Sequence, residues 1–188
     1  IFVVTNNEDR LSGVKKLNQF TVMNTEVIFI NGPNNPYLAE DVRALQMADF
    51  IMFDEIAISD LNEKQQSALY SWVQQGGTIL LGTDDFGTGA AGIFEDSLPL
   101  AFDGSEAAIA AEDLSKFTRN GVFTADVNVS RATLKDSGTN HIAVNNTLLV
   151  GQTGIGKGRI MQTTFSLGDE PLSSMAGYGK LLAEILSL

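Results

Sequence analysis

Cysteine is absent from this 188-residue chain, and histidine occurs once, as His141. Without a thiol the chain can form no disulfide, no thiolate metal site and no cysteine nucleophile. A single imidazole likewise excludes any site that needs two. Basic residues are few, with 12 Lys and Arg against 23 Asp and Glu. The net charge of −11 disfavours nucleic acid and anionic lipid as partners.

Long apolar runs are also missing. None approaches the ~20 residues of a membrane span, so we expect no direct membrane insertion of this segment. The hydrophobic share of 44% is nevertheless ordinary for a globular protein, and the length suits one domain with a real core. The chain starts at Ile1-Phe2-Val3-Val4 without Met. We therefore expect a piece of a longer protein, or a form left after processing.

The first half alternates short apolar runs with stripes of apolar residues at helical spacing. The clearest helix begins at Asn62 and Gln65, which are spaced as a capping box, and ends at Gly76-Gly77. Strands that are apolar on both faces are typical of a parallel sheet covered by helices on both sides. The pattern predicts four such strands, at residues 1–5, 27–30, 50–53 and 78–81.

The second half is patterned differently. Apolar runs at 148–150 and 159–165 predict two strands joined through 154–158, and an amphipathic stripe at 178–186 predicts a final helix. Residues 106–114 fit a helix or a strand. We expect antiparallel strands added to the same sheet. The fold class is then α/β, a three-layer sandwich with a mostly parallel, flavodoxin-like sheet and antiparallel C-terminal strands, forming a single domain over 1–188.

One glycine-rich segment nearly matches a phosphate-binding P-loop. Residues 151–158 read Gly-Gln-Thr-Gly-Ile-Gly-Lys-Gly, but Gly158 stands where the motif needs Ser or Thr for magnesium. The residues that follow are β-like, whereas a P-loop leads into a helix. The segment therefore predicts an exposed β-turn at 154–158 that binds no nucleotide.

Two acidic pairs directly follow predicted strands. Asp54-Glu55 comes after the third strand, and Asp84-Asp85 comes after the fourth, next to the glycine-rich segment 86–92. Open α/β sheets bind ligands at the carboxyl ends of their strands. Four carboxylates at that edge could bind a ligand or a cation such as magnesium or calcium. Alternatively they only cap helices and turns. The pattern leaves the metal unknown and indicates no cofactor.

The middle of the chain resembles a known superfamily. Residues 48–54 (Ala-Asp-Phe-Ile-Met-Phe-Asp), 61–65 (Leu-Asn-Glu-Lys-Gln) and 69–82, which include Gly76-Gly77, are similar to class I glutamine amidotransferase-like proteins. The likeness is greatest to noncatalytic branches such as the trehalose-utilisation-like and β-galactosidase trimerisation-like domains. It covers 48–82 well and 151–188 loosely. It implies the fold and a degenerate, noncatalytic member.

The family's catalytic groups are missing from the matching positions. Active members place a cysteine on the turn after the strand, where Gly82-Thr83-Asp84-Asp85-Phe86 stands here, so Asp84 lies near the cysteine's place. Their His-x-Glu partner is missing too, since Ile142 and Ala143 follow His141. The resemblance therefore implies an active site without its nucleophile and base.

Two classes of function follow. The first is a noncatalytic binding or assembly module of a larger bacterial protein that is exported or membrane-associated, at the cell surface or outside the cell. Its partners would be other domains of the same protein or a separate protein. The charge is split between −13 for residues 1–113 and +2 for 114–188, which fits such docking or merely a solvated acidic surface. The alternative is a hydrolase, or a sugar- or metal-binding domain, that uses Asp54, Glu55, Asp84 and Asp85.

The absence of any thiol leads to a first prediction. The purified protein should release no ammonia from glutamine above a protein-free blank, because the chain has no thiol to form the thiolate nucleophile of the active members of the superfamily that it resembles. A coupled glutamate dehydrogenase assay measures this directly. Release that scales with protein concentration would contradict the expectation.

Overall fold

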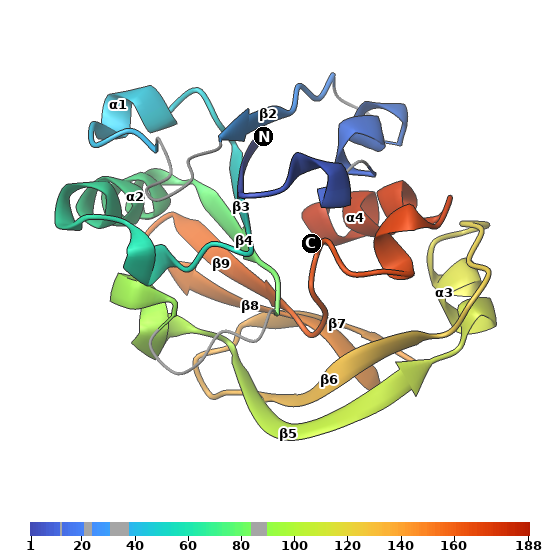
Figure 1. The fold of residues 1–188 in the computed structure, drawn as a ribbon. Helices are drawn as coiled ribbons and strands as arrows, with labels where there is room; N and C mark the ends of the chain where they lie inside the picture. Colours follow the sequence, from blue (N-terminus) through green and yellow to red (C-terminus); the bar gives the residue numbers. More distant parts are fainter. Residues whose placement is uncertain (12, 21–23, 31–37, 84–89) are drawn as a thin grey trace.

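The structure, a computed structural model, describes residues 1–188 except 12, 21–23, 31–37 and 84–89. Its centre is a sheet of seven strands in the order β2-β1-β3-β4-β9-β8-β7 (Figure 1). The first five in this order are parallel, and β8 runs antiparallel between β9 and β7. The strands are β1 (Phe2–Thr5), β2 (Ile28–Ile30), β3 (Phe50–Asp54), β4 (Thr78–Leu81), β7 (Asn140–Val144), β8 (Thr147–Ile155) and β9 (Gly158–Thr163).

The central strands are buried on both faces, which explains their continuous apolar sequence. On β3, Met52 points into one core cluster while Ile51 and Phe53 point into the other. All three side chains have no exposed surface. Successive residues of a strand face opposite sides of the sheet, so a run without polar residues requires cover on both sides. The predicted α/β class and the four predicted parallel strands are confirmed.

Helices supply that cover (Figure 1). One face carries α1 (Val42–Leu45) and α2 (Glu63–Gln75), and the other carries α4 (Tyr178–Leu186) with the 3-10 helices η1 (Glu8–Leu11) and η2 (Val14–Gln19). Helix α2 begins with the predicted capping box. The Asn62 side chain accepts the Gln65 N–H at 3.0 Å, and the Gln65 side chain accepts the Asn62 N–H at 2.9 Å.

The second half departs from the prediction in two respects. Strand β9 was expected as an antiparallel addition, but it lies beside β4 and runs parallel to it, so it is the fifth parallel strand of the sheet. Strands β8 and β7 do extend the main sheet, but β5 (Leu100–Ile109) and β6 (Val127–Leu134) form a separate two-stranded antiparallel sheet. The expectation that all later strands join one sheet is therefore wrong for this pair, which we call the β5–β6 ribbon. Helix α3 (Ala111–Phe117) connects its strands, so the ambiguous residues 106–114 hold the end of a strand and the start of a helix.

The ribbon is joined to β9 and the residue after it at two points, in the middle of β6 and at the start of β5. Backbone N–H of Ser130 donates to the Thr164 carbonyl at 2.7 Å, just beyond the end of β9. The N–H of Leu100 donates to the Gln162 side chain at 3.3 Å. Most of β5 is exposed along its length. The ribbon therefore crosses the main sheet instead of pairing along it (Figure 1).

The predicted turn between β8 and β9 is confirmed, and its glycines have a packing role. Gly156 has φ +60°, a conformation that favours glycine. The Lys157 N–H donates to the Gln74 carbonyl at 3.0 Å, and the Arg159 N–H donates to the Gly77 carbonyl at 3.1 Å. The turn thereby supplies donors to carbonyls at the C-terminal end of α2, which lack partners within the helix.

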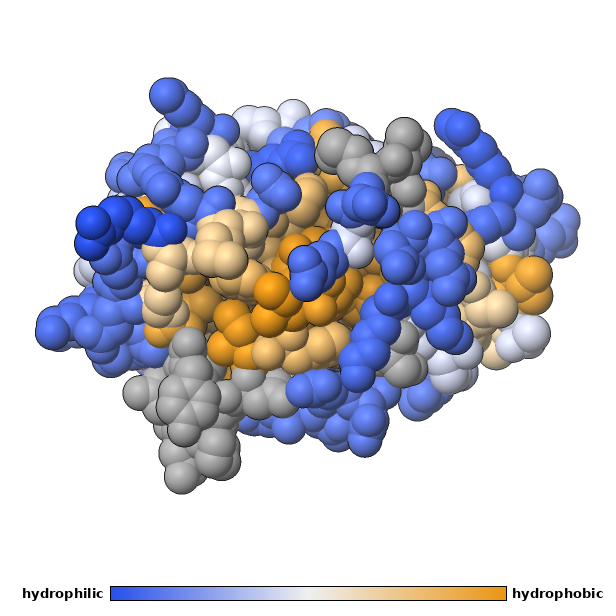
Figure 2. All heavy atoms as spheres, turned by 90° about the horizontal axis from the view of Figure 1, so that it is seen from above, coloured by the Kyte–Doolittle hydropathy of each residue, from blue (hydrophilic) through white to orange (hydrophobic). Residues whose placement is uncertain are grey.

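The sheet edge at β2 presents apolar side chains. Figure 2, which views the molecule from this edge, shows apolar residues gathered in the middle of the face with hydrophilic residues around them. Ile28 of β2 is 42% exposed. Among the described residues, no helix has the length and apolar character required to cross a membrane.

Gly158 leads to the second prediction. A Cβ at this position would lie 2.1 Å from the Val73 carbonyl oxygen and 2.2 Å from that of Gly77. Gly158→Ala should therefore lower the free energy of unfolding by about 1–3 kcal/mol. Gly154→Ala is the matched control, because nothing lies within 4 Å of its Cβ position, and it should stay within about 0.5 kcal/mol of the parent protein. Urea denaturation measures both, and equal midpoints for the two variants would refute the packing role.

Candidate functional site

A pocket lies where the central parallel strands end. Residues that directly follow β1, β3 and β9 line it, namely Asn6, Glu55 and Thr164, and Thr83 reaches it from just beyond β4. The β5–β6 ribbon closes another side with Glu106, Asn128 and Ser130. Its volume is about 620 Å³. This is the edge of an open α/β sheet at which ligands bind, and the predicted place of the site.

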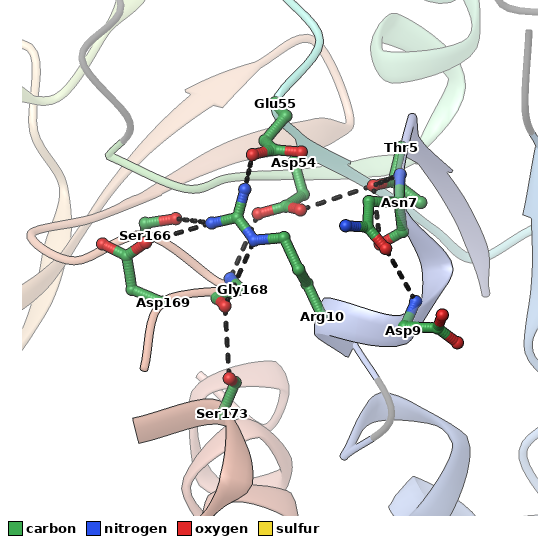
Figure 3. A network of polar contacts seen from close by, with 10 residues as sticks. All are labelled: Thr5, Asn7, Asp9, Arg10, Asp54, Glu55, Ser166, Gly168, Asp169 and Ser173. Carbon is green, nitrogen blue, oxygen red and sulfur yellow. Dashed lines mark hydrogen bonds and ion pairs between the residues drawn. The ribbon is translucent and has the colours of Figure 1, made fainter. Parts of the chain in front are cut away.

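Arg10 holds the floor of this pocket together (Figure 3). Its guanidinium forms an ion pair with Glu55 and a second one with Asp169, in which Nη2 lies 3.0 Å from Oδ1. Nε also donates to the Gly168 carbonyl at 3.3 Å, and Nη2 to the Ser166 hydroxyl at 3.4 Å. The planar guanidinium has five N–H groups in a fixed geometry, which suits it to join several acceptors at once.

Asp54 lies behind Arg10 and has no exposed surface. Its carboxylate accepts the Gly168 N–H at 3.1 Å and the Thr5 hydroxyl at 3.4 Å. Asp54 therefore joins the ends of β1 and β3 to the segment after β9. A buried carboxylate is tolerated only where such donors compensate for lost hydration.

Glu55 has an unusual backbone conformation, with φ +56°. The left-handed region costs a residue with a Cβ about 1–3 kcal/mol, and it persists only where the surroundings impose it. Here the turn places the Glu55 side chain in the pocket beside Arg10, while Asp54 immediately before it points inward (Figure 3).

Tyr178, the first residue of α4, completes the inner side of the network. Its hydroxyl donates to the Leu167 carbonyl, and the residue has no exposed surface. Burial, and secondarily the negative charge of Asp54, raises the pKa of the Tyr178 hydroxyl above its usual value near 10. The phenol therefore stays protonated in the folded protein.

The four predicted site residues have different outcomes. Glu55 lines the pocket, whereas Asp54 is enclosed beneath it. Asp84 and Asp85 lie outside the described residues, as do residues 86–89 of the predicted loop. Within the described part of the chain, no group of three or more His, Asp or Glu side chains is placed to hold a metal ion.

Neither Arg10 nor the residues that follow β9 were identified from the sequence as part of the site. Arg10 is one of only five basic residues in the first 113, and it follows the first strand closely, which was the available signal. Ser166 and Asp169 lie in the segment that follows β9, whereas Glu55 directly follows β3. Their meeting with Arg10 depends on the sheet order, which places β9 beside β4.

A second pocket of about 610 Å³ adjoins the first. Thr83 and Ser130 line both, so the two are lobes of one cleft. We call the first the polar lobe and the second the apolar lobe. Apolar residues from the segment after β3, from the end of β4, from the segment before β5 and from β5 itself line the apolar lobe, among them Ile58, Leu81, Leu98 and Phe102. Glu95, Lys135 and Gln162 also line it.

Comparisons with known proteins place the chain by its fold. No protein-family model matches the sequence, and no curated protein matches it. Among solved structures, a cytoplasmic protein of Salmonella typhimurium has a TM-score of 0.65 at 12% identity, covering 99% of this chain and 97% of that one. A ThuA-like protein of Bacteroides uniformis has a TM-score of 0.58 at 10% identity, covering 98% and 88%.

A third likeness concerns part of a larger protein. The β-galactosidase of Rahnella has a TM-score of 0.56 at 13% identity, covering all of this chain but 31% of that one. At such identities the likeness shows the fold and nothing of the activity. The fold is thus similar to that of a protein described as ThuA-like.

The Tyr178 environment leads to the third prediction. Unfolded tyrosine ionises near pH 10, whereas folded Tyr178 keeps its proton, so the unfolded state gains stability as pH rises above 10. Above pH 10, Tyr178 should therefore lower the free energy of unfolding by up to about 1.4 kcal/mol per pH unit. At pH 7, Tyr178→Phe should lower the free energy of unfolding by about 1 kcal/mol, because the hydrogen bond to the Leu167 carbonyl is lost. Above pH 10, the stability of this variant should fall less steeply with pH than that of the parent protein. Urea titrations from pH 7 to 11 measure both, and parallel curves would contradict the assignment.

Proposed function

We propose that this chain is a noncatalytic binding module whose polar lobe binds a carbohydrate or another neutral polyol. The observation that carries the proposal is the chemistry of the lobe. Carboxylates, two amides, hydroxyls and one guanidinium converge there from the ends of four parallel strands, the segments that follow them and the β5–β6 ribbon. Its size lies within the range of small-molecule pockets.

The polar groups match what a sugar offers. Each sugar hydroxyl donates one hydrogen bond and accepts others, so neighbouring hydroxyls require both acceptors and donors. Glu106 supplies carboxylate oxygens from β5, and the amide of Asn128 supplies a donor and an acceptor from β6. Both side chains belong to exposed residues of the ribbon. They therefore bind a ligand without breaking the Arg10 network.

The charge of the lobe separates neutral ligands from anions. Arg10 is the only cation among the described lining residues, against Glu55, Glu106 and Asp169, which leaves the lobe with a net charge of −2. Arg10 is already paired with two of these carboxylates. A phosphate or carboxylate ligand would thus be repelled by the excess negative charge of the lobe, whereas a neutral polyol carries no charge to be repelled.

The noncatalytic part of the proposal rests on the state of the candidate acids. Asp54 is enclosed and accepts two hydrogen bonds, and Glu55 is held in an ion pair. A hydrolase needs one carboxyl group that protonates a leaving group and a second that acts as nucleophile or base. The alternative in which Asp54 and Glu55 form such a pair therefore has less support than binding.

The comparisons support a module that works in more than one setting. The same fold accounts for nearly all of the Salmonella protein and for under a third of the β-galactosidase. The name β-galactosidase indicates a carbohydrate substrate, which is consistent with a carbohydrate ligand for this chain. We further propose that this module belongs to a larger bacterial protein, exported or membrane-associated, in which it serves binding or assembly.

The fourth prediction concerns binding by the polar lobe. Methyl β-D-galactoside, glucoside and mannoside are titrated by calorimetry and by ligand-observed NMR, and at least one should bind. Asn128→Ala should weaken that binding about fivefold or more, because an amide in the lobe is lost. Asn18→Ala, an exposed position on η2 outside both lobes, is the matched control and should bind as the parent protein does.

Two further measurements can contradict the proposal. The 6-phosphate of the best sugar should bind at least about tenfold more weakly at low salt, because of the negative charge of the lobe. Tighter binding of the phosphate would overturn the neutral-ligand assignment. Release of 4-nitrophenol from nitrophenyl glycosides by the pure protein would overturn the noncatalytic assignment.

A further inference from the structure

The cleft is chemically divided along its length. The polar lobe is lined by carboxylates, hydroxyls, amides and the Arg10 guanidinium. The apolar lobe is lined by aliphatic residues and Phe102, with Glu95, Lys135 and Gln162 as its charged or amide-bearing members. Thr83 and Ser130 lie at the junction, since each lines both lobes. A single ligand that spans the junction would meet polar groups at one end and an apolar surface at the other.

The ribbon creates this division through an irregularity in β5. Phe102 pairs with Ala132 and Glu106 pairs with Ser130, so four residues of β5 span the distance covered by two of β6. Gly104, in the middle of the extra residues, has φ +79° and an open Cβ position. Such a bulge re-aims the side chains on either side of it. Phe102 thereby lines the apolar lobe and Glu106 the polar lobe.

Phe102 keeps part of its surface exposed to solvent. It is 38% exposed, although it is a large aromatic side chain that lines the same lobe as the buried Leu81 and the partly buried Leu98. An aromatic ring that lines a hollow and keeps part of its surface in water gains free energy when a ligand covers it. Lys135 and Gln162 provide polar groups at the same lobe.

From this arrangement we infer that the ligand is a glycoside with an apolar, aromatic aglycone, whose sugar occupies the polar lobe and whose aglycone occupies the apolar lobe against Phe102. The inference rests on the proposed function for the sugar end and goes beyond it in naming the second half of the ligand. Phe102 is then a specificity-determining residue, and Thr83 and Ser130 lie beside the glycosidic linkage.

The test compares matched ligands and matched variants. Methyl and 4-nitrophenyl β-glycosides of galactose, glucose and mannose are titrated by calorimetry, with 4-nitrophenol alone as a further probe. For the sugar that binds, the nitrophenyl glycoside should bind about tenfold tighter than the methyl glycoside. Phe102→Ala should remove most of that difference and leave the methyl glycoside unchanged. Met47→Ala, 79% exposed and outside both lobes, should change neither.

The outcomes separate this inference from the proposed function. Equal affinity for methyl and nitrophenyl glycosides would overturn the inference and leave sugar binding intact. An equal loss for both ligands in Phe102→Ala would overturn it as well. Nitrophenol alone binding as tightly as its glycosides would show that the sugar contributes nothing, which overturns the proposed function. A lack of binding by every glycoside would overturn both.

Discussion

The buried carboxylate of Asp54 is the interaction on which the site depends. It accepts the Gly168 N–H and the Thr5 hydroxyl, so the ends of β1 and β3 and the segment leaving β9 meet at one charged group. Arg10 then covers it from the solvent side and binds the Gly168 carbonyl. Removing such an acceptor would leave a buried donor unpaired, at a cost of about 1–3 kcal/mol. The pocket above this network therefore has a rigid floor.

The β5–β6 ribbon is the second constraint, because it turns an open sheet edge into a cleft. Anchored by Ser130 to the segment after β9, it carries Glu106 and Asn128 to one lobe and Phe102 to the other. The scaffold beneath is shared with proteins of only 10–14% identity, while function depends on side chains placed at the edge.

The sequence was most informative where structure is local. The capping box of Asn62 and Gln65, the stop at Gly76-Gly77 and the apolar strands each depend on residues close in the chain, and all were predicted. The near P-loop was also interpreted correctly as a turn. Its Gly158 is explained by the approach to Val73 and Gly77 at the end of α2, which no pattern within the motif could have shown.

By itself, the sequence determined the α/β class, four of the five parallel strands and the absence of thiol chemistry, and it led to the prediction of a site at the carboxyl edge of the sheet. Hydrophobic periodicity and composition suffice for these, because they depend on which residues must leave water. The tertiary structure decided which side chains meet there. The left-handed backbone of Glu55 directs the Asp54 side chain into the core and the Glu55 side chain into the pocket. Arg10 contacts Asp169, which lies 159 positions away in the sequence. Such encounters follow from strand order and from the path of the ribbon, and residue spacing along the chain carries no record of either.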